Sequence, residues 1–281
     1  MDDKLYIIGN GFDLHHGLNT SYMHFRDYCR KCKPSMWTKL TELYGNSINE
    51  DKWWWQFEDM LSYVDYNSLV DSHNGQAIGG NKVENVLKNQ LPIIFGNWIL
   101  NITNKIQADS ALNIDSNSLF FSFNYTLLLE NVYHISHERI WHIHHSIKDV
   151  DRIVLGHDAD DRKLFLQYIN EKSRYNSISP GVIDNVRLNI AKGAKNVKGR
   201  ISRHKYDIYT KYHNLKHIIA MGFSFNKIDM PYIKSIVNVN SIPDGIIWDI
   251  FYHIDSEKNS IAKMLAENDI HSEVPFRFVK W

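Results

Sequence analysis

Short apolar runs recur along the chain and are separated by longer stretches in which apolar residues have helical spacing. Each run ends in a turn or polar residue, which is typical of a buried strand. The runs cover residues 4–8, 119–123, 140–143, 152–155, 217–221, 245–252 and a final one near 276–279. Apolar and polar residues do not alternate within them, so we expect a sheet that is covered on both faces and therefore mostly parallel.

The stretches between these runs predict helices, because their apolar residues recur on one face. The predicted helices cover residues 21–31, 52–64, 82–106, 127–136, 161–172, 231–239 and 256–268. Thr20 is the expected cap of the first, and Pro92 is the expected position of a kink in the third. Part of the region from 187 to 217 is expected to be loop, because it contains Gly193 and Gly199.

Alternating strands and helices predict an α/β fold, with a Rossmann-like and mostly parallel sheet. The region 20–115 is almost wholly helical and is too long for a single crossover between two strands. We interpret it as a helical insertion or subdomain after the first strand, within one domain that spans residues 1–281.

Composition indicates a globular protein of a reducing compartment. The 281 residues are 43% hydrophobic, and 32 Lys and Arg balance 32 Asp and Glu, which argues against a protein that coats nucleic acid. Two cysteines exclude a disulfide framework. No secretory signal is visible, and the longest apolar stretch, near 91–100, is too short to cross a bilayer. We therefore expect a cytoplasmic protein with no membrane contact.

Residues 187–217 are the exception to this balance. They contain nine Lys and Arg against one Asp, a local charge of +8 in a neutral chain. A solvated basic surface, a phosphate or nucleic-acid site and a contact between subunits all remain open.

A glycine-containing turn directly follows the first predicted strand. It comprises Gly9, Asn10, Gly11, Phe12 and Asp13. Such a turn lets the backbone approach a phosphate, and the helix after it offers amide groups to an anion. The next glycine, Gly17, is too distant for the dinucleotide fingerprint. Spacing alone leaves both a nucleotide site and an ordinary strand-to-helix turn open.

Two further predicted strands end in polar side chains. Asn124 and Tyr125 follow the second strand, and the Asn amide suits a ribose hydroxyl, a water molecule or a turn. His142 and His144 end the next, on one face if the alternation continues, and are suited to acid–base chemistry. Together with His145 and His157 they are also a rival set that could give two or three metal ligands, although no carboxylate or cysteine accompanies them at helical spacing.

A later strand runs into a second glycine loop, which contains Gly222 and Ser224. The carboxyl ends of parallel strands meet at one edge of a sheet. All of these loops are therefore expected to converge on one site.

Several blocks of the chain together resemble one known family. They are 5–14, 16–22 with Phe25, Trp55 with Phe57 and Glu58, 121–125 with Glu130, 142–144, 155–157, and 222–224 with Asp229 and Tyr232. In this order they resemble the bacteriophage abortive-infection AbiH-like family, over most of the chain. The resemblance implies a role in defence against phage, but it assigns no role to Glu58.

That family is similar, more distantly, to the sirtuin-like NAD-binding fold. The similarity implies that the first glycine loop, with Gly9, Asn10 and Gly11, holds the phosphates of NAD. It implies equally that the later loop, with Gly222 and Ser224, contacts the adenosine side.

The same similarity implies the catalytic residues. Asn124 would position the nicotinamide ribose or a water molecule, and His144 would act as the base. His145 stands where a glycine is expected, which would narrow the pocket. The zinc module of deacylating sirtuins is absent, because Cys29 and Cys32 are the only cysteines.

The resulting hypothesis is an anti-phage effector that binds NAD and hydrolyses it to nicotinamide and ADP-ribose, without a metal. Phe12 or Tyr125 would cover the nicotinamide, and Asp13 would bind ribose or cap the helix. The alternatives are a non-catalytic nucleotide sensor and a nucleic-acid-directed toxin that uses residues 187–217. A homo-oligomer or a partner defence protein is expected to restrain the activity.

Overall fold

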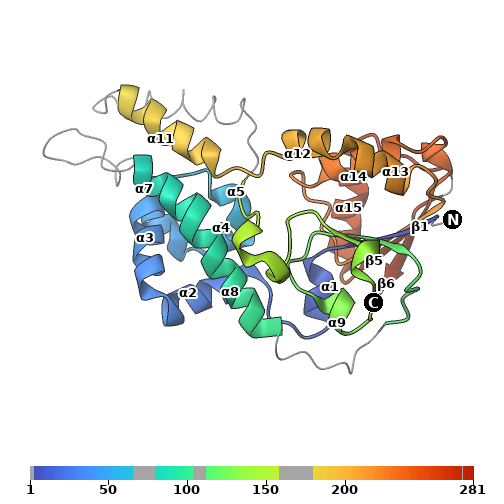
Figure 1. The fold of residues 1–281 in the computed structure, drawn as a ribbon, viewed down its shortest axis with the longest axis horizontal. Coiled ribbons are helices and arrows are strands. Elements are labelled where there is room, and N and C mark those ends of the chain that lie inside the picture. Colours follow the sequence, from blue (N-terminus) through green and yellow to red (C-terminus); the bar gives the residue numbers. More distant parts are fainter. Residues whose placement is uncertain (1–2, 66–79, 104–111, 158–179, 274) are drawn as a thin grey trace, which may run out of the picture. The chain divides into compact units, whose positions relative to one another are not determined.

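Six strands form one sheet in which every neighbouring pair is parallel. They are β1 (Lys4–Ile8), β2 (Leu119–Ser122), β3 (Ile140–His142), β4 (His217–Met221), β5 (Ile247–Tyr252) and β6 (Arg277–Lys280). Their order is β3-β2-β1-β4-β5-β6, which is that of a Rossmann-like fold and confirms the predicted class. In Figure 1 the blue β1 accordingly lies with the red strands from the end of the chain.

The computed structural model describes all residues except 1–2, 66–79, 104–111, 158–179 and 274. The helix predicted over 161–172 lies outside the described residues. The chain forms two compact units, of which the first comprises residues 1–20, 99–149 and 197–281. The second comprises residues 21–98 and 150–196, so it includes a segment that the sequence pattern did not connect with the helical insertion.

Helices cover both faces of the sheet in the first unit. Four of them bury one face, with Leu5, Phe121, Ile218 and Ile250 among its core residues. They are α12 (Val197–Arg203), α13 (Lys205–Tyr212), α14 (Met230–Asn238) and α15 (Asp255–Glu267). The opposite face, with Tyr6, Ile8 and Phe120, packs against the short helices α1 (Asn10–His15) and α9 (Leu128–Asn131). Burial on both faces explains why the strands are continuously apolar.

The second unit consists mainly of helices around an aromatic core. Its helices include α2 (Tyr22–Cys32), α3 (Pro34–Tyr44), α4 (Asp51–Trp55), α5 (Phe57–Met60), α7 (Gly80–Glu84), α8 (Leu91–Thr103, shared with the first unit) and α11 (Pro180–Lys192). The buried ring of Phe25 lies at its centre and contacts those of Trp54, Phe57, Phe95 and Trp98.

The strand predicted over 152–155 is wrong. Arg152 ends a 3-10 segment, Ile147–Arg152, and the residues after it are irregular. Ile153 is buried, but a Cβ added to Gly96 would lie only 2.6 Å from its Cδ1. The apolar run is therefore buried by close packing against a helix, and burial alone does not distinguish this from strand pairing.

Helix boundaries also differ from the predicted ones. Ser21, rather than Thr20, caps α2, because its hydroxyl accepts from the amide of His24. The irregularity near Pro92 is a π-helical segment, Asn85–Gln90, immediately before it. The predicted helix over 52–64 is broken between α4 and α5, and the one over 127–136 contains only α9. Residues 187–217, expected to be partly loop, lie mostly in α11, α12 and α13.

None of the helices that the structure describes is both long enough and apolar enough to span a membrane.

Candidate functional site

The candidate site lies at the carboxyl edge of the sheet, in the first unit. The strand order reverses between β1 and β4, and Gly9 and Gly222 directly follow these two strands. Open parallel sheets bind their ligands at such a reversal point. The structure therefore brings together the two glycine loops that the sequence predicted to converge.

The two glycine loops pack against each other through their backbones. The amide of Gly9 donates to the Met221 carbonyl at 3.1 Å, and that of Gly11 donates to the Gly222 carbonyl at 2.9 Å. Gly222 has a φ of +62°, and a Cβ there would collide with the backbone of Phe12. Glycine is therefore required by both conformation and space.

This packing changes what the first loop can offer to an anion. The Gly11 amide is used by Gly222, and the Phe12 amide donates to the Gly9 carbonyl at 2.9 Å. The expectation that the first amides of α1 are available to a phosphate is therefore wrong for these two groups. Cations near the loop would have to contribute more of the binding of an anion.

The other predicted loop residues differ in exposure. The side chains of Asn10 and Ser224 are exposed, so both can meet a ligand. Phe12 is fully buried, with its ring 4.5 Å from that of His16 and 5.7 Å from that of Tyr133. The expectation that Phe12 covers a nicotinamide is therefore not met, because its ring belongs to the core under the loop.

Asn124 ties the end of β2 to the end of β1. Its Nδ2 donates to the Gly9 carbonyl at 3.0 Å, and its side chain is also hydrogen-bonded to Asp13. Thr126 donates its hydroxyl to the same carboxyl group, with Oγ1 at 3.0 and 3.1 Å from the two oxygens. All three polar side chains are buried. Asn124 thus holds the glycine loop in position at the carboxyl edge of the sheet.

Burial raises the pKa of Asp13 to about 7, although hydrogen bonds from Thr126 and Asn124 and the nearby His142 oppose this. The carboxyl group therefore changes charge near neutral pH. It neither binds an exposed ligand nor caps α1 by a side-chain hydrogen bond.

We expect Asp13→Asn to flatten the dependence of stability on pH. The Asp13 carboxyl ionises near 3.8 ordinarily but near 7 in the fold, so between these values the folded state binds more protons than the unfolded state. The free energy of unfolding should thus be highest below the lower value and fall as pH rises to the upper one, by up to about 4 kcal/mol. Urea unfolding of both proteins across this range tests it, and an equally steep fall in Asp13→Asn would assign the effect to other groups.

His142 extends the polar network to β3. Its Nδ1 donates to the Asn124 carbonyl at 3.1 Å, and its Nε2 lies 3.1 Å from Oε1 of Glu130 in α9. Burial opposes ionisation of Glu130, but the hydrogen bond and charge of His142 outweigh it and lower the pKa of the carboxyl group. Both partners accept hydrogen bonds, so His142 forms both bonds only as the imidazolium. The sequence pattern suggested His142 only as a general base or a metal ligand, and did not predict this buried network.

His144 has different partners from His142, contrary to the prediction that the two share a face. β3 ends at His142, and His145 has a φ of +62°, so strand alternation does not continue to His144. The His144 side chain is 2% exposed, and its Nε2 lies 3.4 Å from Oδ1 of Asp229. Its ring stacks with that of Tyr125 at a centroid distance of 6.2 Å.

Arg200 of α12 brings a cation to this cluster. Its Nη1 donates to the carbonyl of Ile143 at 2.9 Å, directly before His144 in the chain. Burial lowers the pKa of its guanidinium, and the nearby Tyr232 and Tyr125 partly offset this. The candidate cluster therefore consists of Tyr125, His144, Arg200, Asp229 and Tyr232. Arg200 was missed within the basic segment, because nothing in its local sequence distinguishes it from its neighbours.

His145 occupies a backbone conformation that favours glycine. Its φ of +62° lies in the left-handed region, which costs an ordinary residue about 1–2 kcal/mol. This is the position at which the sequence resemblance expects a glycine. The turn it forms, with its amide donating to the His142 carbonyl at 3.1 Å, directs the preceding His144 into the cluster.

We expect His145→Gly to raise the free energy of unfolding by up to about 1 kcal/mol. Glycine removes the strain of the left-handed conformation, and this gain in free energy exceeds the cost of the greater entropy of glycine in the unfolded chain. Urea unfolding measures this. His137→Gly is the matched control. His137 lies in a 3-10 turn at an ordinary φ, so this variant should be less stable than the unaltered protein. A loss of stability in His145→Gly would show that contacts of the imidazole outweigh backbone strain.

Glu58 and His157, which the resemblance includes, lie in the second unit. Glu58 forms a 2.8 Å ion pair with Lys195, and their side chains are 12% and 2% exposed. The Lys195 amide donates to the His157 carbonyl at 2.9 Å, and His157 Nε2 donates to the Ile190 carbonyl at 3.0 Å. Both residues are therefore held in this unit by the segment that follows α11.

Metal binding finds no support in the described part of the chain, where no three His, Cys, Asp or Glu side chains lie close enough to hold an ion. Cys29 is buried and Cys32 is exposed, and both are free thiols.

Comparison with known proteins gives one match. The family model described as bacteriophage abortive infection AbiH matches residues 5–252, which is most of the chain. No curated protein and no solved structure matches the chain.

Proposed function

The chain belongs to the bacteriophage abortive infection AbiH family and acts in defence against phage, and we propose that it does so by binding and hydrolysing NAD. The substrate site of this proposal is the carboxyl edge of the first unit. The proposed products are nicotinamide and ADP-ribose.

The observation that carries the proposal is the position of the His144–Asp229 pair. It joins the segment after β3 to the segment after β4, at the carboxyl edge of the Rossmann-like sheet where the two glycine loops also lie. A histidine held by a carboxylate is a common general base, and parallel sheets of this order commonly bind dinucleotides at this edge. The sirtuin-like similarity that we infer from the sequence would assign the same role to His144.

The chemistry requires little more than a base and correct positioning. The bond between C1′ of the ribose and the nicotinamide nitrogen breaks, and the electron pair leaves with nicotinamide, which becomes neutral. A water oxygen bonds to C1′, and its proton passes to His144. With Nε2–H directed toward Asp229, Nδ1 is the accepting nitrogen, and the carboxylate stabilises the imidazolium.

The surrounding residues have positioning roles in this proposal. Arg200 would attract the pyrophosphate, which compensates for the amides that the glycine loop uses internally. Tyr125, stacked on His144 and 8% exposed, would cover the nicotinamide in place of Phe12, which is fully buried. Asn124 would act through the loop that it holds.

The burial of His144 also favours a second candidate function. At 2% exposure, its imidazole meets a substrate only after neighbouring side chains move. A protein that binds NAD or ADP-ribose without turnover, and signals by that movement, is the alternative. For both the enzyme and the sensor, restraint of the activity by an oligomer or a partner protein stays a prediction.

Incubation of the purified protein with NAD tests the proposal, with nicotinamide and ADP-ribose separated by chromatography and NAD binding followed by calorimetry. The proposal expects release of both products, with Asn124→Ala slower than the unaltered protein. Binding without release would support the sensor. Absence of both binding and release would overturn the proposal.

A further inference from the structure

A hollow of about 420 Å³ lies at the opposite edge of the same sheet, away from the candidate site. Three of its lining residues lie at or near the starts of strands, because Leu119 begins β2, Arg139 directly precedes β3 and Asn214 lies three residues before β4. It therefore opens at the amino edge, entirely within the first unit. A volume of this size is within the range that binds small organic groups.

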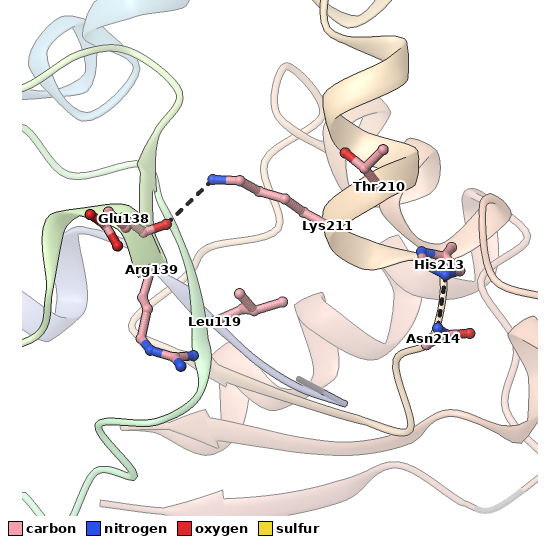
Figure 2. A pocket seen from close by; sticks show the side chains of 7 residues that line it. All are labelled: Leu119, Glu138, Arg139, Thr210, Lys211, His213 and Asn214. Carbon is pink, nitrogen blue, oxygen red and sulfur yellow. Dashed lines mark hydrogen bonds between the residues drawn. The ribbon is translucent and has the colours of Figure 1, made fainter. Parts of the chain in front are cut away.

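Leu119 is the one apolar residue among the described residues that line this hollow, and the other lining residues are charged or polar. Figure 2 shows Lys211 and Arg139 on either side of Leu119, with Thr210, His213 and Asn214 along the α13 wall. The ammonium of Lys211 donates to the Glu138 carbonyl at 3.5 Å, and the guanidinium of Arg139 donates to the Asn117 carbonyl at 2.6 Å. Both acceptors are backbone carbonyls, and the acidic Glu138 also lines the hollow.

The surface of α13 beside the hollow presents aromatic rings to solvent. Tyr206 is 77% exposed and Tyr209 is 54% exposed. Tyr206 precedes Thr210 by four residues and so lies on the same side of the helix. The Tyr209 ring stacks on that of His213 at 5.0 Å, which places it next to the lining.

The structure shows which cations of the basic segment, residues 187–217, are paired and which are exposed. Lys192 and Lys195 pair with Glu84 and Glu58, and Arg200 faces the candidate cluster. The part in the first unit, residues 197–217, still has six Lys and Arg against one Asp, a net charge of +5. Arg203, Lys205 and Lys211 are exposed on α12 and α13, so three exposed cations accompany the two tyrosines, together with the exposed Asp207.

We propose that this surface binds a single-stranded nucleic acid, with one nucleotide seated in the hollow. Cations that follow a backbone, together with exposed rings on which bases stack, are the combination that binds single strands without sequence preference. A free phosphate would use the cations and leave Tyr206 and Tyr209 without a role. This binding goes beyond the proposed function, because it uses the other edge of the sheet.

The experiment measures fluorescence anisotropy of labelled RNA and DNA single strands of about 12 nucleotides with the full chain, over a range of salt concentrations. We expect binding of at least one strand, with an affinity that falls as salt increases. Lys211→Ala should weaken it and reduce the slope of log K against log salt by about 0.7. Tyr206→Ala should weaken binding roughly five- to a hundredfold with the slope unchanged, because stacking releases no counterions.

Lys263→Ala on α15 is the matched control, since it removes an exposed lysine from the same unit and should leave binding unchanged. Tyr206 and Lys211 are exposed, so neither substitution should affect folding, which circular dichroism checks. The proposal is overturned if the protein binds neither strand at low salt. It is also overturned if Lys211→Ala and Tyr206→Ala bind like the control, or if a duplex of the same length binds as tightly as the strands.

Discussion

His144→Gln is expected to lower the rate of nicotinamide release from NAD by about 10²- to 10⁴-fold, the usual contribution of a general base. Glutamine retains a polar side chain of similar size but accepts no proton at neutral pH. The measurement is the initial rate of product release at saturating NAD, with NAD binding measured in parallel. Binding should remain, because the base contacts the attacking water.

Asp229→Asn and His145→Gly distinguish catalysis from structure in this experiment. Asp229 acts through His144, so its replacement should reduce the rate less and shift its pH dependence, since the imidazolium loses a stabilising charge. His145→Gly, next in the chain, should retain the rate because glycine readily adopts the left-handed conformation of this turn. Full activity of His144→Gln would contradict the assigned base.

Lys195→Met is expected to lower the free energy of unfolding by about 3–5 kcal/mol, because it leaves the carboxylate of Glu58 buried without the cation that pairs with it. The Lys195 side chain is 2% exposed, so little water replaces it. For a chain of this size, the melting temperature should fall by roughly 6–15 °C. Thermal unfolding followed by circular dichroism measures the change.

Lys192→Met is the matched control for this prediction. Lys192 lies three residues earlier and forms a 2.7 Å ion pair with Glu84, but its side chain is 50% exposed. Exposed pairs contribute about 1 kcal/mol or less. The double variant Lys195→Met/Glu58→Leu should recover most of the lost stability, since an apolar pair commonly replaces a buried ion pair without loss. Equal effects of Lys195→Met and Lys192→Met would show that burial does not decide the contribution of the pair.

The strands of the sheet were predictable because burial on both faces selects continuously apolar sequence. The predicted limits of β1 and β4 agree with the structure, and both run directly into the glycines that meet at the site. The same criterion failed for 152–155, where an apolar run packs against Gly96 of a helix. Apolar character reports burial, and it does not report whether the backbone finds a neighbouring strand.

The histidines at the end of β3 show a second limit. Alternation predicted one face for His142 and His144, and the left-handed turn at His145 separated them. No residue in that stretch marks the turn, because a glycine, its usual signal, is absent. His142 became part of a buried network with Glu130, and His144 joined Asp229.

Local sequence thus determined the class of fold, the identity of six strands and the glycine loops at their carboxyl ends, because each depends on the burial or conformation of neighbouring residues. The tertiary structure alone decided the partners of the side chains in the candidate site. Asp229 lies 85 positions from His144 in the chain, and Arg200 reaches the backbone beside it from a crossover helix. Such pairings depend on strand order and helix packing, which bring distant residues together without leaving a local pattern in the sequence.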